Sequence, residues 1–353
     1  MTLCKMADNR EQAPAAAPVT VKQPVNPAVN PLENMMGYLK ADMASVNAFI
    51  LDKMQSDIPL IPELAGHLIA AGGKRIRPML TLASAALFGY SGNRQNRLAA
   101  CVEFIHTATL LHDDVVDESD QRRGKASANA VFGNEAAVLV GDFLFSRSFQ
   151  LMVEDGSLDV LRILSNASAV IAEGEVLQLS TANNLDTTRD DYFHVIRSKT
   201  AELFAAACEV GAVVAGRSSL ECAAIRDYGI NLGIAFQISD DVLDYAASAD
   251  VLGKSLGDDF KEGKLTLPVI IALEKATAEE KIFWQRTLMS LEQTDEDLHH
   301  AVEIMRRHEA FKLSLDVARG YAAKGIANLL SLPANHVRGD LEALIAFAVE
   351  RQY

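Results

Sequence analysis

Residues 106–124, HTATLLHDDVVDESDQRRG, combine clustered carboxylates with adjacent cations. If the segment is helical, Asp113 and Asp117 share one face because four positions separate them, and Asp114 lies about 100° round from Asp113. Such a cluster repels itself unless a cation lies within it. Hard divalent ions such as Mg²⁺ bind carboxylate oxygens and leave coordination sites open for phosphate. The basic side chains that follow are Arg122 and Arg123.

The same spacing occurs a second time, in the stretch FQISDDVLDY, at Asp240, Asp241 and Asp244. A single DDxxD is also compatible with a solvated acidic helix face, which is a common feature. Both copies are flanked by Leu, Ile, Val or Phe, so both helices are predicted to be largely buried. Because buried carboxylates need a partner, two triads facing each other across a cavity would hold several Mg²⁺ ions and one polyanion.

The overall composition predicts an all-helical protein of one large domain or two ordinary ones. The chain has 353 residues, and 49% of them are hydrophobic, which is ample for a sizeable core. Ala and Leu dominate, while Pro and Gly are sparse after the first segment. The formal net charge of −14 argues against nucleic acid as a partner, so any basic cluster should be local and functional.

Cysteine usage and hydropathy indicate a cytoplasmic protein. Cys4, Cys101, Cys208 and Cys222 form no CxxC pair, and no histidine spacing supports zinc, so reduced thiols are expected. No run of about 18 apolar residues is evident, which predicts no membrane span. The first ten residues, MTLCKMADNR, contain no apolar core of a secretory signal.

The chain divides into an Ala/Pro-rich tail, residues 1–31, and a single all-helical domain, residues 32–353. Prolines interrupt helical hydrogen bonding in the tail, which has little to bury and is predicted to be disordered. Helical patterns are expected from Leu32 onward and again at 94–118, 126–153, 157–181, 187–215 and 220–246. Shorter amphipathic helices, without obvious chemistry, are expected from about residue 264 to the end.

The stretch GGKRIRP is a candidate anion site. Its two glycines free the backbone, and Pro78 suits the first turn of the next helix. In the functional interpretation, Lys74 and Arg77 bind a phosphate beside a helix N-terminus, with Arg75 between them. The alternative interpretation is a basic surface turn.

Several polar residues interrupt apolar helical patterns and are further candidates. His106 shares the face of Asp113 two turns away, although a lone helical histidine is often a satisfied core residue. Lys199, followed by Thr200, needs an anion if it is buried, or it pairs on the helix face with a glutamate such as Glu202. Other candidates are Gln237, one turn before Asp241, and Lys254, Asp258, Lys261 and Lys264 of the glycine-rich stretch LGKSLGDDFKEGKLTLP. Such a stretch is either a lid over phosphates or a surface turn.

Taken together, these motifs resemble the trans-isoprenyl diphosphate synthase family, also called the polyprenyl synthases. GGKRIRP, LLHDDVVD with RRG, the Lys199-Thr200 pair, QISDDVLD and the later lysines occur in the family's order after residue 35. The stretch IAEGEVLQL, from Ile171, is similar to the long-chain members that make octaprenyl or decaprenyl diphosphate for ubiquinone. The resemblance implies an all-α isoprenoid synthase fold, with antiparallel helices around a central active-site cavity, and a homodimer.

The resemblance also implies a role for each candidate residue. It implies Mg²⁺, about three ions per site, held against the allylic diphosphate. The ligands would be Asp113, Asp117 and Asp240, supported by Asp114, Asp241 and Asp244. The allylic diphosphate would be bound by Arg122, Lys199, Lys264 and Lys254. Isopentenyl diphosphate would be bound by Lys74, Arg77, His106 and Arg123. Thr200 and Gln237 would lie near the developing carbocation, and Asp258 would reach a metal through water.

Product length is expected to depend on the floor of the cavity. One helical turn rises about 5.4 Å, close to one isoprene unit, so residues a turn before Asp113 meet the growing chain. In the family, bulky aromatics there give short products, whereas Ala108 and Thr109 are small and imply a long one. The floor would lie deeper, on a neighbouring helix, at Leu161, Leu164 or Ser168. Alternatively, the two small residues merely allow close helix packing.

The implied reaction ionises the allylic carbon–oxygen bond, condenses isopentenyl diphosphate with the cation and loses a proton, plausibly to the departing diphosphate. Its long product is expected to be handed to the membrane. Three other classes fit less well. A terpene cyclase usually lacks two intact DDxxD motifs together with GGKRIRP, and a head-to-head synthase shows DxxxD spacing. A non-catalytic subunit of a heteromeric synthase should have lost a triad. A geranylgeranyl-type synthase remains an alternative, against which Ala108 and Thr109 weigh.

Overall fold

The computed structural model describes residues 30–70, 72–122, 124–246 and 257–350, and within them almost all regular structure is helical. The all-α prediction is confirmed. The long helices are α1 (Pro31–Lys53), α4 (Arg94–Val116), α6 (Asn134–Asp155), α7 (Leu158–Thr181), α10 (Ser219–Ala246) and α16 (Ala310–Leu329). The others are α2 (Leu60–Ala70), α3 (Ile76–Leu87), α5 (Ala128–Phe132), α8 (Arg189–Ile196), α9 (Glu202–Val214), α12 (Asp258–Lys261), α13 (Leu267–Glu274), α14 (Ala278–Trp284), α15 (Asp297–Arg307) and α17 (His336–Val349). Two π-helical turns, η1 (Arg197–Ala201) and η2 (Gln285–Met289), and a hairpin of β1 (Gln121–Arg122) with β2 (Lys125–Ala126) complete the described elements.

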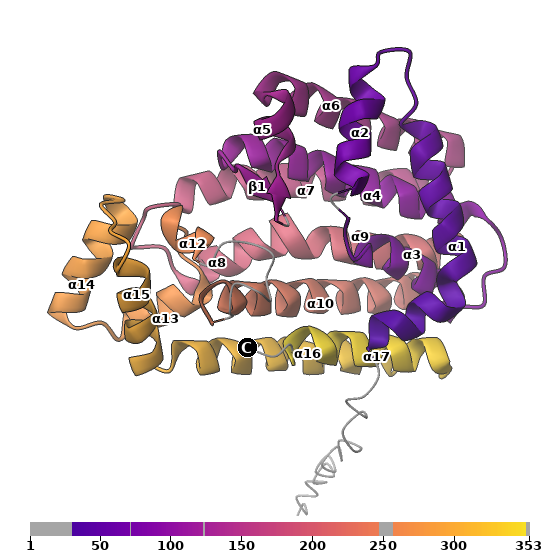
Figure 1. Ribbon diagram of the computed structural model, residues 1–353. Coiled ribbons are helices and arrows are strands. Elements are labelled where there is room, and N and C mark those ends of the chain that lie inside the picture. Colours follow the sequence, from indigo (N-terminus) through magenta and orange to yellow (C-terminus); the bar gives the residue numbers. More distant parts are fainter. Residues whose placement is uncertain (1–29, 71, 123, 247–256, 351–353) are drawn as a thin grey trace, which may run out of the picture.

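The helices form stacked layers, which Figure 1 shows edge on. Helix α10 packs between α9 and α16, and α17 lies along α16 in the outer layer. On the other side of α9, α3 and α7 pack against it, and α4 lies between α3 and α6. The short helices α12 to α15 form a separate group at the left end of the molecule in Figure 1.

Close packing between these layers depends on glycines where helices meet. A Cβ on Gly229 of α10 would lie 2.6 Å from Cα of Ala205 on α9, and one on Gly233 would lie 2.5 Å from Cα of Ala201 in η1. Gly174 of α7 meets the same π-helical turn, because a Cβ there would lie 2.9 Å from the backbone nitrogen of Lys199. Helices α7 and α10 are therefore held at backbone contact with η1, and α10 is held equally close to α9.

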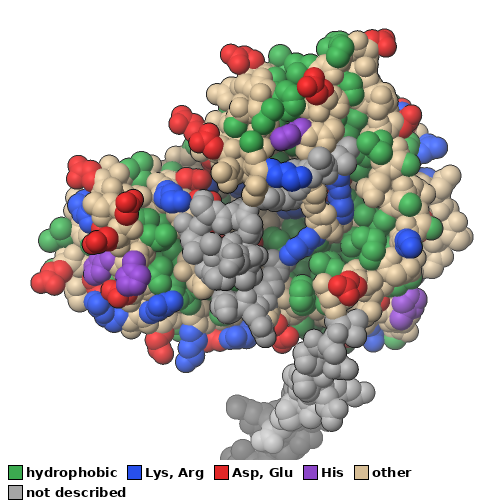
Figure 2. Space-filling view, in the orientation of Figure 1, with side chains coloured by type: hydrophobic (Ala, Val, Ile, Leu, Met, Phe, Trp, Pro, Cys, Tyr) green, Lys and Arg blue, Asp and Glu red, His purple; other side chains and the backbone are tan. Residues whose placement is uncertain are grey.

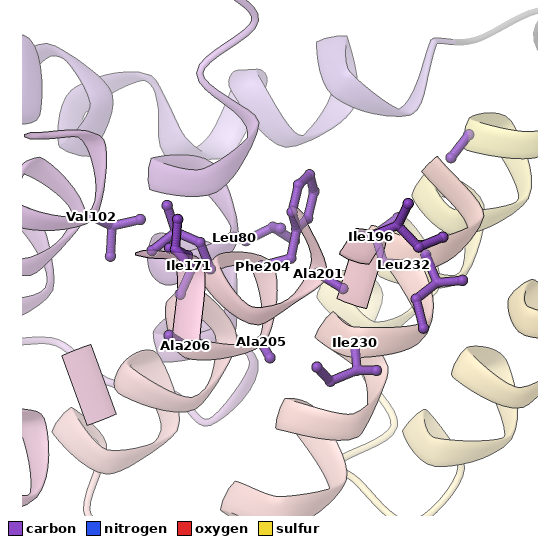
Figure 3. Close-up of a cluster of buried hydrophobic side chains, with 14 of the residues drawn as sticks. Leu80, Val102, Ile171, Ile196, Ala201, Phe204, Ala205, Ala206, Ile230 and Leu232 are labelled. Atoms are coloured by element: carbon purple, nitrogen blue, oxygen red, sulfur yellow. The ribbon is translucent and has the colours of Figure 1, made fainter. Parts of the chain in front are cut away.

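A single apolar cluster fills the space between the layers. Leu80, Val102, Ile171, Phe204 and Leu232 come from different helices and converge in it, as Figure 3 shows. Each is at most 2% exposed. Burying side chains of this size stabilises the fold by about 1.5–3 kcal/mol each relative to leaving them in water. The core thus fixes the spacing of the helices that carry the candidate site.

The expected helix boundaries hold in most places and differ in two. The stretch 126–153 was expected as one helix, but Gly133, at φ 86°, separates α5 from α6, and the hairpin occupies residues 121–126. Hydrophobic periodicity cannot detect a one-residue break of this kind. Within 187–215, five residues adopt the π-helical turn η1 instead of continuing the α-helix.

The predicted tail cannot be compared with the structure over residues 1–29, which lie outside the described part. The described chain begins at Asn30, whose side chain accepts a hydrogen bond from the backbone nitrogen of Leu32 and caps α1. Pro31 already belongs to the first turn, where its missing N–H costs nothing. Helix α1 therefore begins one residue before Leu32, where the helical pattern is expected to start.

Of the described helices, α6 is the one with the length and apolarity that a membrane span requires. It packs along α4, and 39% of its apolar window is buried inside the protein. A core helix passes the same test, so this composition is weak evidence for a span.

We expect Gly229→Ala to lower the free energy of unfolding by about 1–3 kcal/mol, because a methyl group there must displace the backbone of α9. Gly320→Ala on the exposed face of α16 is the matched control, since a Cβ at that position meets nothing within 4 Å. It should raise stability by about 0.5–1 kcal/mol through helix propensity alone. Denaturant titrations of the two variants measure the difference, and equal stabilities would contradict the close packing.

Candidate active site

A cavity of about 670 Å³ opens between α3, α4, α7, η1, α10 and α12. Its lining contains more acidic than basic side chains, and both DDxxD segments contribute to it. Lys and Arg side chains gather around the centre of the face that Figure 2 shows. The structure thus brings together residues that lie more than a hundred positions apart in the sequence.

Five of the six motif aspartates line this cavity, and they come from the ends of two long helices. Asp113 lies in the last turn of α4, and Asp117 caps that helix. Asp240 and Asp244 lie in the last two turns of α10. Burial raises the pKa of Asp113, and the neighbouring Asp117 adds to the effect, while Lys199 opposes it. Ionised Asp113 therefore depends on nearby positive charge.

The remaining aspartate of the first motif, Asp114, does not line the cavity. It is 2% exposed, and both its carboxylate oxygens accept hydrogen bonds from Nε of Arg122, at 2.7 and 2.9 Å. Its buried charge is therefore compensated, and it holds Arg122 of the hairpin at the cavity edge. Asp114 supports the site through this arginine. Arg123, the second arginine of the motif, lies outside the described residues.

Lys199 projects into the cavity from the π-helical turn η1. Its ammonium donates to Oε2 of Glu175 over 2.6 Å and lies 3.6 Å from Oδ2 of Asp113. The alternative pairing with Glu202 is not found, because Glu202 forms an ion pair with Arg226. Single π-helical turns shift the residues that follow by about 100° relative to an α-helix and are frequent at functional sites.

Lys264 forms the second link between cations and the first motif. Its ammonium donates to Oδ2 of Asp117 over 3.3 Å and also pairs with Glu262. Burial disfavours its charged form, but Asp259, Asp117 and Glu262 outweigh this effect and raise the pKa of Lys264. The lysine thus stays charged inside the cavity. Lys254, predicted to act with it, lies outside the described residues.

Thr200 and Gln237 belong to a hydrogen-bond network that ends at the second motif. The Thr200 hydroxyl donates to Oε1 of Gln237 over 2.9 Å, and Nε2 of Gln237 donates to Oδ1 of Asp241 over 2.7 Å. Oδ2 of Asp241 accepts from the hydroxyl of Tyr192 over 2.6 Å. Burial raises the pKa of Asp241, whereas the bonds from Tyr192 and Gln237 favour its ionised form. Asp241 therefore organises the cavity wall.

The GGKRIRP stretch forms the basic corner of the cavity. Nη1 of Arg77 lies 3.1 Å from Nε2 of His106, and its guanidinium stacks 4.4 Å from the ring centroid of Phe204. Lys74 also lines the cavity, whereas the charge of Arg75 is paired with Glu103. The ring of Phe204 thus holds the guanidinium of Arg77 in a fixed orientation, in which its N–H groups can bind an anion.

The predicted chain-length residues separate in the structure. Thr109 lines the cavity, one turn below Asp113, and its hydroxyl donates to the carbonyl of His106 over 2.8 Å. Ala108 is 1% exposed and lies in the apolar core beside the cavity. The cavity floor was expected at Leu161, Leu164 and Ser168 of α7. None of these three residues lines the described cavity.

The donor set of the cavity fits a hard divalent cation. Its candidate ligands are all carboxylates, and the described residues contain no group of three acidic, histidine or cysteine side chains close enough to hold a metal unaided. Mg²⁺ meets this condition, because it keeps waters and binds through one or two carboxylates together with substrate phosphates. Lys199 and Lys264 balance the carboxylates in the structure described.

Sequence reasoning missed several acidic and phenolic residues that line the cavity. They are Glu175, Asp259, Glu262 and Tyr192. The glycine before Glu175, in the EGE sequence, was the available signal, because a glycine inside a helical pattern often marks a close backbone approach. Tyr192 lies in an ordinary apolar pattern, and no sequence signal marks it as a site residue.

The fold and this cavity define a prenyltransferase that uses allylic and isopentenyl diphosphates. The chain belongs to the polyprenyl synthetase family, whose profile, described as "Polyprenyl synthetase", matches residues 58–305. The resemblance stated from the motifs is thereby confirmed.

Characterised relatives are similar over most of their length. The chain is 48% identical to an octaprenyl diphosphate synthase of Escherichia coli over 322 residues, which cover 91% of this chain and 99% of that one. It is 37% identical to an all-trans-nonaprenyl-diphosphate synthase of Rhodobacter capsulatus, over 92% of this chain and 99% of that one.

Solved structures agree with the fold. A polyprenyl synthase of Caulobacter crescentus, in complex with calcium and isoprenyl diphosphate, superposes with a TM-score of 0.89 at 52% identity. The match covers 91% of this chain and 98% of that one. A decaprenyl diphosphate synthase of Rhodobacter capsulatus gives a TM-score of 0.87 at 52% identity, over 91% and 99% of the two chains.

Burial, partly offset by Lys199, raises the pKa of Glu175 from 4.5 to about 7. The folded protein therefore binds a proton that the unfolded chain releases in this interval, so the free energy of unfolding should fall as pH rises from 4.5 to 7. Glu175→Gln should remove this decline. Denaturant titrations of metal-free protein across the interval measure it, with the exposed Glu173→Gln as control. Parallel curves for wild type and Glu175→Gln would refute the assignment.

Proposed function

We propose that the protein is a long-chain all-trans polyprenyl diphosphate synthase, which condenses isopentenyl diphosphate units onto an allylic primer such as farnesyl diphosphate. The main observation in support is that both DDxxD segments and a set of lysines and arginines line one cavity. The octaprenyl, nonaprenyl and decaprenyl relatives support a long product. A non-catalytic subunit is disfavoured because both triads are intact, and a geranylgeranyl-type synthase is disfavoured by Ala108 and Thr109.

We assign Mg²⁺, about three ions per site, to Asp113 and Asp117 on one helix and Asp240 on the other. When bound, Mg²⁺ supplies positive charge to the diphosphate leaving group. Asp258, which lines the same cavity, is assigned a contact through water. The calcium and isoprenyl diphosphate of the Caulobacter crescentus structure support a divalent cation with a diphosphate in this fold.

Three described cations then hold the allylic diphosphate: Arg122, Lys199 and Lys264. In the structure Lys199 and Lys264 are paired with carboxylates that line the cavity, and a diphosphate that enters can take the place of these partners. Arg122 keeps its pair with buried Asp114 and presents its remaining donors to the diphosphate. As the carbon–oxygen bond breaks, charge builds on the leaving group, and preplaced cations stabilise it without reorganisation. Lys254 is assigned to the same diphosphate from the sequence motif.

The basic corner is assigned to isopentenyl diphosphate. Lys74, Arg77 and His106 lie together at the end of the cavity where Phe204 supports the arginine. Arg123 is added from the motif. The double bond of this substrate attacks the allylic cation, and the departing diphosphate takes the proton released after bond formation. No Ser–His or His–Asp pair is needed for this chemistry.

Several further assignments complete the proposal. We propose a homodimer, supported by an apolar stripe on the outer face of α6 that exposes Val138, Leu139, Phe149 and Val153. Large exposed apolar patches mark association surfaces. We propose a cytoplasmic location, with which the free thiols of Cys101, Cys208 and Cys222 agree. The product would supply the ubiquinone side chain and pass to the membrane because it is too apolar for water.

Replacing Asp113 or Asp240 by Asn should lower kcat by at least about a thousandfold, because each substitution removes a metal-binding charge worth several kcal/mol. Incorporation of labelled isopentenyl diphosphate into farnesyl diphosphate, with Mg²⁺ present or chelated, measures the effect. Asp316→Asn, on the exposed face of α16, is the control and should leave turnover intact. Unchanged turnover in either motif variant would contradict the proposed function.

Thr109→Phe should shorten the product by several isoprene units, because the ring enters the cavity one turn below Asp113. Ala108→Phe should act in the same direction through the adjacent core. Thr109→Val keeps the volume and removes the hydroxyl, so its products should keep their length. Reversed-phase chromatography of the dephosphorylated products measures the distribution. An identical distribution for Thr109→Phe and wild type would show that this position does not meet the chain.

A further inference from the structure

The tyrosine that closes the hydrogen-bond network in the cavity wall, Tyr192, has no part in the reaction described above. Its side chain lies in α8 and reaches the second aspartate motif on α10. Tyr192 and Asp241 are each 4% exposed, so water does not compete for the 2.6 Å hydrogen bond between them. A buried hydroxyl bound to a carboxylate is a strong, charge-assisted interaction.

The hydrogen bonds of this network all run toward Asp241. The hydroxyl of Tyr192 and the amide nitrogen of Gln237 both donate to Asp241. With Nε2 committed to Asp241, Gln237 presents Oε1 to Thr200 at 2.9 Å. The hydroxyl hydrogen of Thr200 therefore points toward Gln237, and its oxygen lone pairs remain available to the cavity that Thr200 lines.

This orientation suits a cation in the cavity. Prenyl transfer passes through an allylic cation, which an acceptor atom stabilises and a hydroxyl hydrogen repels. If Tyr192 is removed, one oxygen of buried Asp241 loses its donor, and the carboxyl group can rotate away from Gln237. The Gln237 amide can then reverse, which allows the hydroxyl of Thr200 to turn.

We propose that Tyr192 is a positioning residue for prenyl transfer. By donating to Asp241 it fixes the Gln237 amide, and so it turns the electron-rich side of Thr200 toward the place where the allylic cation develops. The inference rests on the proposed function, because that function supplies the cation. It adds a residue outside the sequence motifs, on a helix that carries none of the predicted site residues.

Tyr192→Phe tests the proposal, and Tyr228→Phe is its matched control. Tyr228 is also fully buried and donates one hydrogen bond, to the carbonyl of Leu341 over 2.8 Å, but it does not line the cavity. We expect Tyr192→Phe to lower kcat by about tenfold to hundredfold, the value of one hydrogen bond to a charged group. KM for both diphosphates should stay within about twofold. Tyr228→Phe should reduce thermal stability and leave kcat unchanged.

A double-mutant cycle with Thr200→Val decides whether Tyr192 acts through Thr200. If it does, Tyr192→Phe has little further effect on kcat once the hydroxyl of Thr200 is gone. If the two substitutions instead lower kcat by independent factors that multiply in the double variant, the proposal is overturned. Equal kcat values for Tyr192→Phe and wild type would also overturn it. Should Tyr192→Phe not fold, Asp241→Asn carries the same test. Its amide can donate to Gln237, so kcat should fall and be insensitive to Thr200→Val, and unchanged kcat would again overturn the proposal.

Failure of this inference differs from failure of the proposed function. If wild type elongates farnesyl diphosphate but Tyr192→Phe does so equally well, the positioning role is wrong and the function stands. If wild type makes no prenyl product, with Mg²⁺ present, the function itself is wrong.

Discussion

The structure depends on one electrostatic constraint: several carboxylates are buried around one cavity, and each needs positive charge nearby. Burial raises the pKa of Asp113, Glu175 and Asp241, so none of them would stay ionised in an apolar surrounding. Lys199 and Lys264 provide charge from within the cavity. A divalent cation bound among these carboxylates would add positive charge, and a bound diphosphate would add negative charge beside the lysines.

The packing of the helices around η1 places the charge of Lys199 beside Asp113. Gly174 of α7 and Gly233 of α10 let these two helices approach η1 at backbone contact, and Gly229 lets α10 approach α9 equally closely. A single added methyl group would prevent each contact. The π-helical turn then directs Lys199 to Asp113 and Thr200 to Gln237 at the same time. Packing and chemistry therefore share the same few residues.

Aspartates with the same motif spacing have different tasks in the structure. Asp113 and Asp117 face the cavity, whereas Asp114 binds Arg122 and is covered. In the second motif, Asp241 accepts from two neighbouring side chains and organises the wall. The spacing predicts that these residues cluster, because positions on adjacent helix turns are close. It does not specify which carboxylate meets an arginine, since that partner comes from the hairpin.

The sequence by itself determined the helical architecture, the two aspartate helices and the family, since these follow from local periodicity and from motifs with fixed spacing. Cations such as Lys74 and Lys264 were also identifiable, because charge within a glycine-rich stretch stands out. Only the tertiary structure decided that Lys199 pairs with Glu175 rather than Glu202, and that Tyr192 supports Asp241. The reason is physical: partners on different helices depend on interhelical distances and on a π-helical turn, and neither leaves a local pattern in the chain.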